Sequence, residues 1–212
     1  MKSEFFTRNE TAIRDVLDTV TVLYDTLHQG SHGSLAEQWL EFVCEVFNDE
    51  HLNYRIDING VVHPFVDAEF EVNRTAALDV LNDPKFGEAR RDFDAAFQHL
   101  RDENGKEAIK AMFPAVETAA KVLFPGAMSR LMPNEIDSHL MPRLLSQYAG
   151  NQPAIDAGRQ LLAGMKNWIN AAQPYRHGQE QAEPAEPPKD FVVAHLSAGA
   201  SYLRWMIELC SA

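Results

Sequence analysis

The chain has 212 residues, 45% of them hydrophobic, and it carries 31 acidic against 19 basic side chains, a formal net charge of −12. This length and apolar content predict one folded domain, or one domain with a small additional part. The acidic balance disfavours non-specific binding to the phosphate backbone of nucleic acids, although a local basic patch could still bind RNA.

Cysteine content and hydropathy bear on the compartment. Two cysteines, Cys44 and Cys210, form no disulfide framework in a chain of this length and indicate a reducing environment. No apolar stretch of a signal peptide follows Met1, and no apolar run approaches the length of a membrane span. We therefore expect a cytoplasmic protein without a membrane segment.

Residues 1–50 are predicted to form a pair of helices, because their apolar residues recur at helical spacing. Asn9 is expected to cap the first helix, which ends at Gly30, and the second runs from about Ser34 to Phe47. In residues 51–66 the pattern changes to alternation, and Asn59-Gly60 predicts the type I′ turn of a β-hairpin. Because a lone hairpin is marginally stable, it should pack on helices or pair with another chain.

Residues 67–212 return to helical spacing and are predicted to form a bundle. Helices are expected from Asp67, from about Phe86 and from about Ala108, and Pro114 predicts a kink or a restart in the third of them. The predicted fold class is therefore mainly α, a helical bundle with one small β-hairpin near residues 54–63.

Several prolines are expected to interrupt or start helices after residue 126. Residues 127–151 should be irregular, with Pro142 interrupting short helical pieces, and Pro153 should start a long helix that Pro174 stops. The segment 178–189 is rich in Gln, Glu and Pro and predicts an extended loop. Asp190 is expected to cap the last helix, whose small residues 197–201 would let a neighbouring helix or a second copy approach closely.

Common catalytic and ligand-binding motifs are missing from the sequence. It contains no HExxH, no Cys/His pair at zinc spacing, no GxSxG, no GxxxxGK[ST] and no GxGxxG. His28 and His32 are four residues apart, but Gly30 breaks the helix that would align them. We therefore expect the eight histidines to be solvated or capping residues, and we expect no metal and no cofactor.

Two charged clusters remain as candidate functional residues. Glu117 and Lys121 are four apart on a predicted helix, which suits either a solvated ion pair or a charged pair that faces a cleft. Arg176-His177 follows Pro174 within the cluster Tyr175 to Gly178. Histidine can transfer protons and arginine can stabilise a phosphorane-like charge, as a metal-free ribonuclease requires. The alternative is a helix end whose basic side chains compensate the helix dipole.

Four segments together resemble the HEPN superfamily, and within it the bacterial Abi-C-like proteins associated with abortive infection. They are the hairpin YRIDINGVVHPF, the paired helices DFDAAFQHLRDENGKEAIKAMFPAVETAAKVLF with Glu117 and Lys121, the YRHGQ at the end of a long helix, and the closing helix AHLSAGASYLRWMIEL. The resemblance covers residues 54–212 and implies a HEPN-like bundle over 67–212, behind the helical pair of 1–50 and the hairpin of 51–66.

The resemblance also implies a function. Catalytic members of the superfamily are metal-independent endoribonucleases, in which an arginine precedes a histidine by four to six intervening residues and two protomers share one cleft. His177 matches the histidine, but positions 170–172 hold Asn170, Ala171 and Ala172 instead of the arginine. Arg176 is then the candidate substitute, with Asn170, Tyr175, Gly178, Glu117 and Lys121 in support.

Three functions follow from these observations. We expect a homodimeric, non-catalytic module that binds RNA, a nucleotide or a protein partner in a bacterial defence or stress system. The first alternative is a metal-independent endoribonuclease that uses His177 and Arg176. The second is a purely structural helical protein in which the histidine caps a helix.

Overall fold

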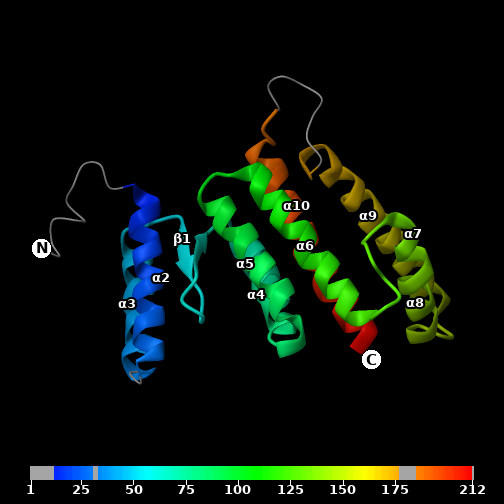
Figure 1. Cartoon of the computed structure of the whole chain (residues 1–212), viewed down its shortest axis with the longest axis horizontal. Coiled ribbons are helices and arrows are strands. Elements are labelled where there is room, and N and C mark those ends of the chain that lie inside the picture. The colour runs from blue at the N-terminus through cyan, green and yellow to red at the C-terminus, as the bar shows by residue number, and fades with distance from the viewer. Residues whose placement is uncertain (1–11, 31–32, 177–184, 212) are drawn as a thin grey trace, which may run out of the picture. The chain divides into compact units, whose positions relative to one another are not determined.

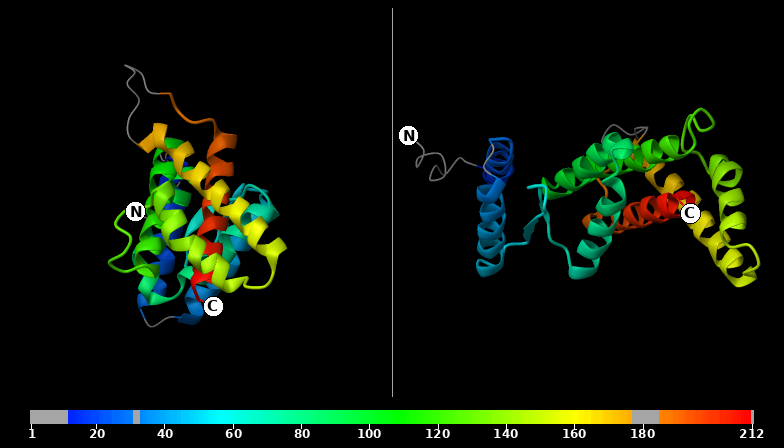
Figure 2. Two further views of the ribbon diagram at one scale, coloured as in Figure 1. Left: turned by 90° about the vertical axis from the view of Figure 1, so that its right-hand side faces the viewer. Right: turned by 90° about the horizontal axis from the view of Figure 1, so that it is seen from below.

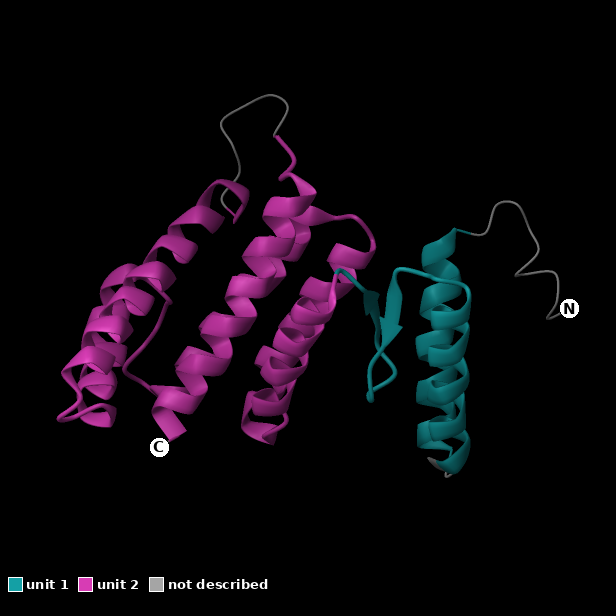
Figure 3. Cartoon of the chain, turned by 180° about the vertical axis from the view of Figure 1, so that it is seen from behind, with its two compact units in different colours: residues 1–66 teal, residues 67–212 magenta. Residues whose placement is uncertain are grey.

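The computed structural model describes residues 12–30, 33–176 and 185–211. The fold is mainly α with one two-stranded antiparallel sheet, which confirms the predicted class (Figure 1). The chain divides into two compact units, residues 1–66 and residues 67–212 (Figure 3). Each unit has a hydrophobic core of its own.

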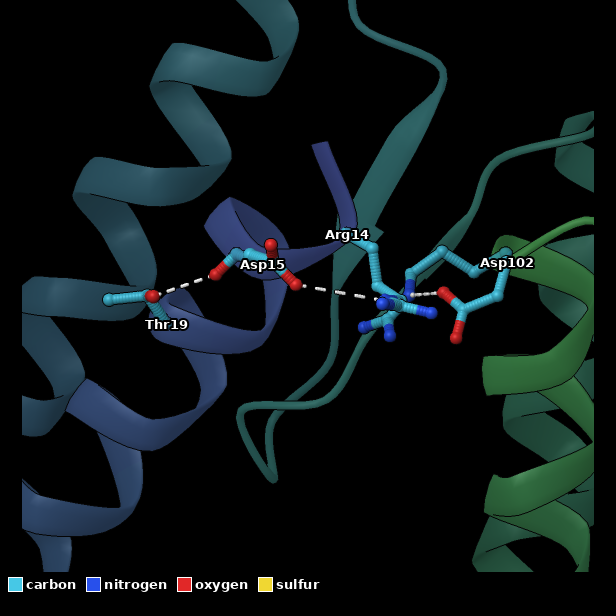
Figure 4. Close-up of polar contacts among 5 residues, drawn as sticks. Arg14, Asp15, Thr19 and Asp102 are labelled. Carbon is cyan, nitrogen blue, oxygen red and sulfur yellow. Dashed lines mark hydrogen bonds and ion pairs between the residues drawn. The ribbon is translucent and has the colours of Figure 1, made fainter. Parts of the chain in front are cut away.

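The first unit contains α2 (Ile13–Gln29), α3 (Gly33–Asp49), β1 (Tyr54–Ile56) and β2 (Val62–Pro64). Its core joins both helices to the hairpin and consists of Leu17, Val43, Phe47, Ile56 and Val62. The hairpin therefore packs on the helices of its own chain. Near the start of α2, Arg14 pairs with Asp15, and the Thr19 hydroxyl donates to the Asp15 carbonyl over 2.7 Å (Figure 4). Asn9, the expected cap, lies outside the described residues.

The hairpin turn differs from the predicted type I′ turn. Only Gly60 has a positive φ, +77°, whereas a type I′ turn requires a positive φ at Asn59 as well. The cause is Asp57, whose carboxylate accepts hydrogen bonds from the backbone N–H groups of Asn59 and Val61 at 2.9 and 3.0 Å. The Tyr24 side chain packs where a Cβ on Gly60 would lie, 2.0 Å from its ring, so α2 holds this turn closely.

The second unit begins with α4 (Ala68–Leu81), η1 (Pro84–Phe86), α5 (Gly87–Arg101) and α6 (Gly105–Leu123). It continues with α7 (Pro133–Glu135), the π-helical turn η2 (Ile136–Leu140), α8 (Met141–Gln147), α9 (Gln152–Arg176) and α10 (Lys189–Ser211). Within this unit α6 packs against α5, α9 and α10, and the same elements can be followed from two further directions in Figure 2. The α6 face turned to the core is fully buried, including Ile109, Met112, Phe113 and Val116.

Prolines interrupt these helices less than predicted. Pro114 lies inside α6 without a restart, and Pro174 lies inside α9, which continues to Arg176. Pro142 is the second residue of α8, just after the π-helical turn ends at Leu140, and residues 133–147 are helical throughout. The wider π turn offers room for a ring that would clash with a carbonyl in a regular α-helix. The predictions of a stop at Pro174 and of an interruption at Pro142 are therefore wrong.

The small residues of α10 pack within the chain. Ser197 and Ser201 share Asn73 of α4, whose side-chain amide donates to the Ser197 carbonyl over 2.7 Å and accepts from the Ser201 hydroxyl over 3.0 Å. Gly199 contacts Met112 of α6 and Trp168 of α9 so closely that a Cβ there would lie 2.7 Å from Met112. This helix begins at Lys189, one residue before the expected cap Asp190, which lies in its first turn.

Within residues 12–30, 33–176 and 185–211, no helix combines the length and the apolar character of a membrane span.

Candidate functional site

The structure brings three of the predicted site residues together, from two helices. Glu117 and Lys121 lie one turn apart on α6, and Arg176 is the last residue of α9. These three residues are called here the Glu117–Arg176 group. His177 and Gly178, the other half of the predicted cluster, lie outside the described residues.

Glu117 accepts the hydrogen bonds of this group. One carboxylate oxygen accepts from Lys121 Nζ over 2.7 Å, and the other accepts from the backbone N–H of Leu131 over 2.9 Å. Burial acts to raise the pKa of Glu117, but these two hydrogen bonds and the charges of Lys121 and Arg176 outweigh it and hold the pKa below its ordinary value. The pair is therefore more than a solvated surface contact, because it also fixes the segment that follows α6.

Arg176 packs on an aromatic ring. Its guanidinium carbon lies 3.2 Å from the centre of the Phe113 ring, one turn of α6 before Glu117. Burial lowers the pKa of Arg176, and the charge of Glu117 acts in the opposite direction. The guanidinium thus lies on a π face and in the electrostatic field of a carboxylate, and both stabilise its positive charge. Its packing explains why the last turn of α9 persists beyond Pro174.

An aromatic stack extends from Phe113 through the core to the start of α10. Its ring pairs have centroid separations of 6.1 Å for Phe113–Trp168, 4.8 Å for Trp168–His195, 5.8 Å for His195–Phe191 and 5.7 Å for Phe191–Tyr175. Tyr175, predicted to support catalysis, is thereby placed as a packing residue at the end of this stack. The rings come from α6, α9 and α10, so the stack fixes the three helices around the Glu117–Arg176 group.

His195 is buried in this stack, 4% exposed, and burial lowers its pKa to about 4. Its Nε2 has no hydrogen-bond partner among the described residues, while its backbone carbonyl accepts from the Trp168 indole over 2.9 Å. His63 is also buried, at 1% exposed. The expectation that histidines are solvated or capping residues is therefore wrong for these two. The sequence does carry a signal for the burial of His195. This residue follows Val192 by three positions and precedes Gly199 by four, which places it on the apolar face of the last helix.

The positions where the HEPN arginine is expected lie on opposite sides of α9. Asn170 is exposed and Ala172 is fully buried. An arginine at position 172 would have to enter the core, whereas one at position 170 would reach solvent. Asn170 takes part in none of the contacts that define the Glu117–Arg176 group.

A separate cavity of about 450 Å³ lies between the α5–α6 turn and the start of α10. Leu100, Gly105, Pro187 and Val192 line it, and Lys189 and Glu103 pair across 3.5 Å beside it. No residue of the Glu117–Arg176 group contributes to this cavity.

In the part of the chain that the structure describes, no three His, Cys, Asp or Glu side chains are grouped so that they could hold a metal ion.

Comparison of the chain with protein-family models, with curated proteins and with solved structures finds no match.

Proposed function

We propose that this chain is a homodimeric, HEPN-like helical module that acts by binding a partner in a bacterial defence or stress system, without catalysing RNA cleavage. The observation that carries the proposal is the engagement of Arg176 by Phe113 and by the charge of Glu117. A catalytic arginine must be able to reach developing charge on a phosphate. Arg176 would have to leave the Phe113 ring and move out of the field of the Glu117 carboxylate first.

The charge of the chain supports a protein partner over RNA. The formal net charge is −12, and binding to nucleic acid gains most of its affinity by neutralising phosphates with lysine and arginine. Within the Glu117–Arg176 group one of the two cations is already hydrogen-bonded to the carboxylate. A protein surface sets no such requirement for positive charge.

A cleavage assay tests the proposal. The purified chain should leave a labelled single-stranded RNA intact with and without EDTA. Light scattering should give the molecular mass of a dimer. The variants Arg176→Ala and His177→Ala should not change the RNA result. Arg159→Ala is the matched control, because Arg159 is an exposed arginine of the same helix that pairs with Asp156. Cleavage that His177→Ala abolishes would overturn the proposal, and so would a monomer at micromolar concentration.

The second candidate function is a metal-independent endoribonuclease with His177 as the proton-transferring group and Arg176 as the charge stabiliser. One observation favours it: the group contains two cations, Lys121 and Arg176, and one carboxylate, which leaves a net positive charge that includes Arg176, the residue before His177 in the sequence. RNA cleavage resistant to EDTA, lost in His177→Ala and in Arg176→Ala but kept in Arg159→Ala, would establish this function in place of the first.

A further inference from the structure

An apolar stripe runs along the exposed side of α3 in the first unit. Its members are spaced four, three and four residues apart, which places them on one helix face: Leu35, Trp39, Phe42 and Val46. Phe42 is 55% exposed and Leu35 is 45% exposed. The adjoining face of the same helix, about 100° around the axis, already forms the core with Val43 and Phe47. Helix α3 is therefore apolar on two faces, and only one of them has a partner within the unit.

The apolar stripe is held in place by the neighbouring helix. The Trp39 indole N–H donates to the Val20 carbonyl of α2 over 3.1 Å, and the Trp39 and Phe42 rings are 5.9 Å apart. Trp39 and Val20 also pack against the core of the unit. The exposed rings are thus pre-positioned, which lowers the entropy lost when a partner binds them.

Carboxylates lie along one edge of the apolar stripe. Glu41, Glu45 and Asp49 follow at four-residue spacing, and Glu45 and Asp49 stand three residues after Phe42 and Val46, on the adjoining helix surface. All three are exposed, and none pairs with a cation in the described part of the chain. Like charges at this spacing repel one another, and α3 has no basic residue in its last turn to compensate its dipole. A cationic partner would relieve both effects.

A second copy that presents the same unit does not meet this requirement. Residues 12–30 and 33–66 contain nine acidic side chains and only two arginines, Arg14 and Arg55. Arg14 pairs with Asp15 (Figure 4), and the Arg55 guanidinium lies 4.0 Å from the centre of the Phe65 ring. Two copies that met through this face would bring carboxylates together without cations between them.

We propose that the apolar stripe of α3 and its acidic edge bind a basic amphipathic helix of another protein. Apolar residues at i, i+3, i+4 and i+7 of the partner would cover the rings of Trp39 and Phe42, and its lysines or arginines would pair with Glu45 and Asp49. The stripe spans eleven residue steps, or roughly 16 Å at the rise of an α-helix, so a partner helix of about three turns covers it. The proposal does not depend on the Glu117–Arg176 group or on the HEPN resemblance.

Synthetic peptides test the proposal by fluorescence anisotropy with the full chain. The first labelled 18-residue peptide has leucines along one helix face and lysines beside them. The second keeps the leucines and replaces the lysines with glutamates, and the third keeps the lysines and replaces the leucines with serines. We expect the first peptide to bind at least tenfold more tightly than either of the others.

Variants of the chain test whether the peptide binds specifically to this surface of α3. Phe42→Asp should weaken binding of the lysine peptide at least tenfold, and the pair Glu45→Lys with Asp49→Lys should reverse the preference toward the glutamate peptide. Val72→Asp is the matched control, because Val72 is an exposed apolar residue of α4, 69% exposed, and should leave binding unchanged. Because Phe42 faces solvent, circular dichroism should show the parent helix content in Phe42→Asp.

Three results would overturn the proposal. They are equal binding of the lysine and glutamate peptides, unchanged binding by Phe42→Asp, and a parent dimer in light scattering that Phe42→Asp dissociates. The last result would assign the face to self-association. Arg176→Ala should leave peptide binding unchanged, so failure of this proposal and failure of the proposed function are distinguishable.

Discussion

Lowering the pH from 7 to 5 should destabilise the second unit through one side chain, His195. Its pKa of about 4 in the folded chain lies below the ordinary value of 6.5, because burial disfavours the charged imidazolium. The unfolded chain therefore binds the proton more tightly than the folded chain. The contribution of His195 to stability is complete above pH 6.5 and is lost progressively as the pH falls toward 4.

The size of this loss follows from the two pKa values. At pH 5 the unfolded imidazole is mostly protonated and the folded one is mostly neutral. The free energy of unfolding should then be lower than at pH 7 by roughly 2 kcal/mol, at about 1.4 kcal/mol per pH unit below 6.5.

His195→Phe isolates this contribution. It keeps an aromatic ring between Trp168 and Phe191, and the backbone carbonyl at position 195 still accepts from the Trp168 indole. It also removes a buried nitrogen that has no partner among the described residues, so the variant should fold at pH 7. Tyr202→Phe is the control, because Tyr202 also packs on Trp168 and burial raises its pKa further from this pH range.

Urea unfolding followed by circular dichroism at pH 7 and pH 5 measures the effect. The parent and Tyr202→Phe should lose the same free energy between the two pH values, and His195→Phe should lose about 2 kcal/mol less. Equal losses in all three proteins would show that the imidazole is protonated within the folded chain, and the account of His195 as a buried neutral ring would be wrong.

Three further substitutions probe other contacts. Gly60→Ala should destabilise the first unit by roughly 2 kcal/mol, because φ is +77° and the new Cβ would meet the Tyr24 ring, and a lower melting temperature in circular dichroism checks this. Asn73→Ala removes three hydrogen bonds to the serines of α10 and should cost about 1–3 kcal/mol in urea unfolding. Glu117→Gln removes the pair with Lys121 and should cost about 1 kcal/mol at pH 7. That difference should disappear as the pH falls below the ordinary Glu pKa of 4.5, because the folded-state pKa is lowered. An unchanged unfolding midpoint in Asn73→Ala or Glu117→Gln contradicts the contact that the substitution removes. An unchanged melting temperature in Gly60→Ala contradicts the close packing of Tyr24 on the turn.

The candidate site depends on both local sequence and helix packing. Local spacing and composition predict Glu117, Lys121 and Arg176 as candidate residues, and the structure brings them together. The sequence marks Phe113 only as part of an apolar helical pattern, yet its ring carries the Arg176 guanidinium. No local rule connects two residues so far apart in the chain, because their contact depends on how α6 and α9 pack.

The amino-acid sequence by itself determined the helical class, the hairpin and the approximate position of most helices, because hydrophobic periodicity and capping residues act within a few positions of the chain. Only the tertiary structure decided that α9 continues past Pro174, that His195 stacks between Trp168 and Phe191, and that Tyr24 covers the hairpin turn. In each case the deciding contact joins residues that are far apart in the chain: Arg176 packs on α6, His195 stacks on α9, and Tyr24 of α2 packs against Gly60. Local periodicity shows which residues avoid water, and packing between helices decides what each of them contacts.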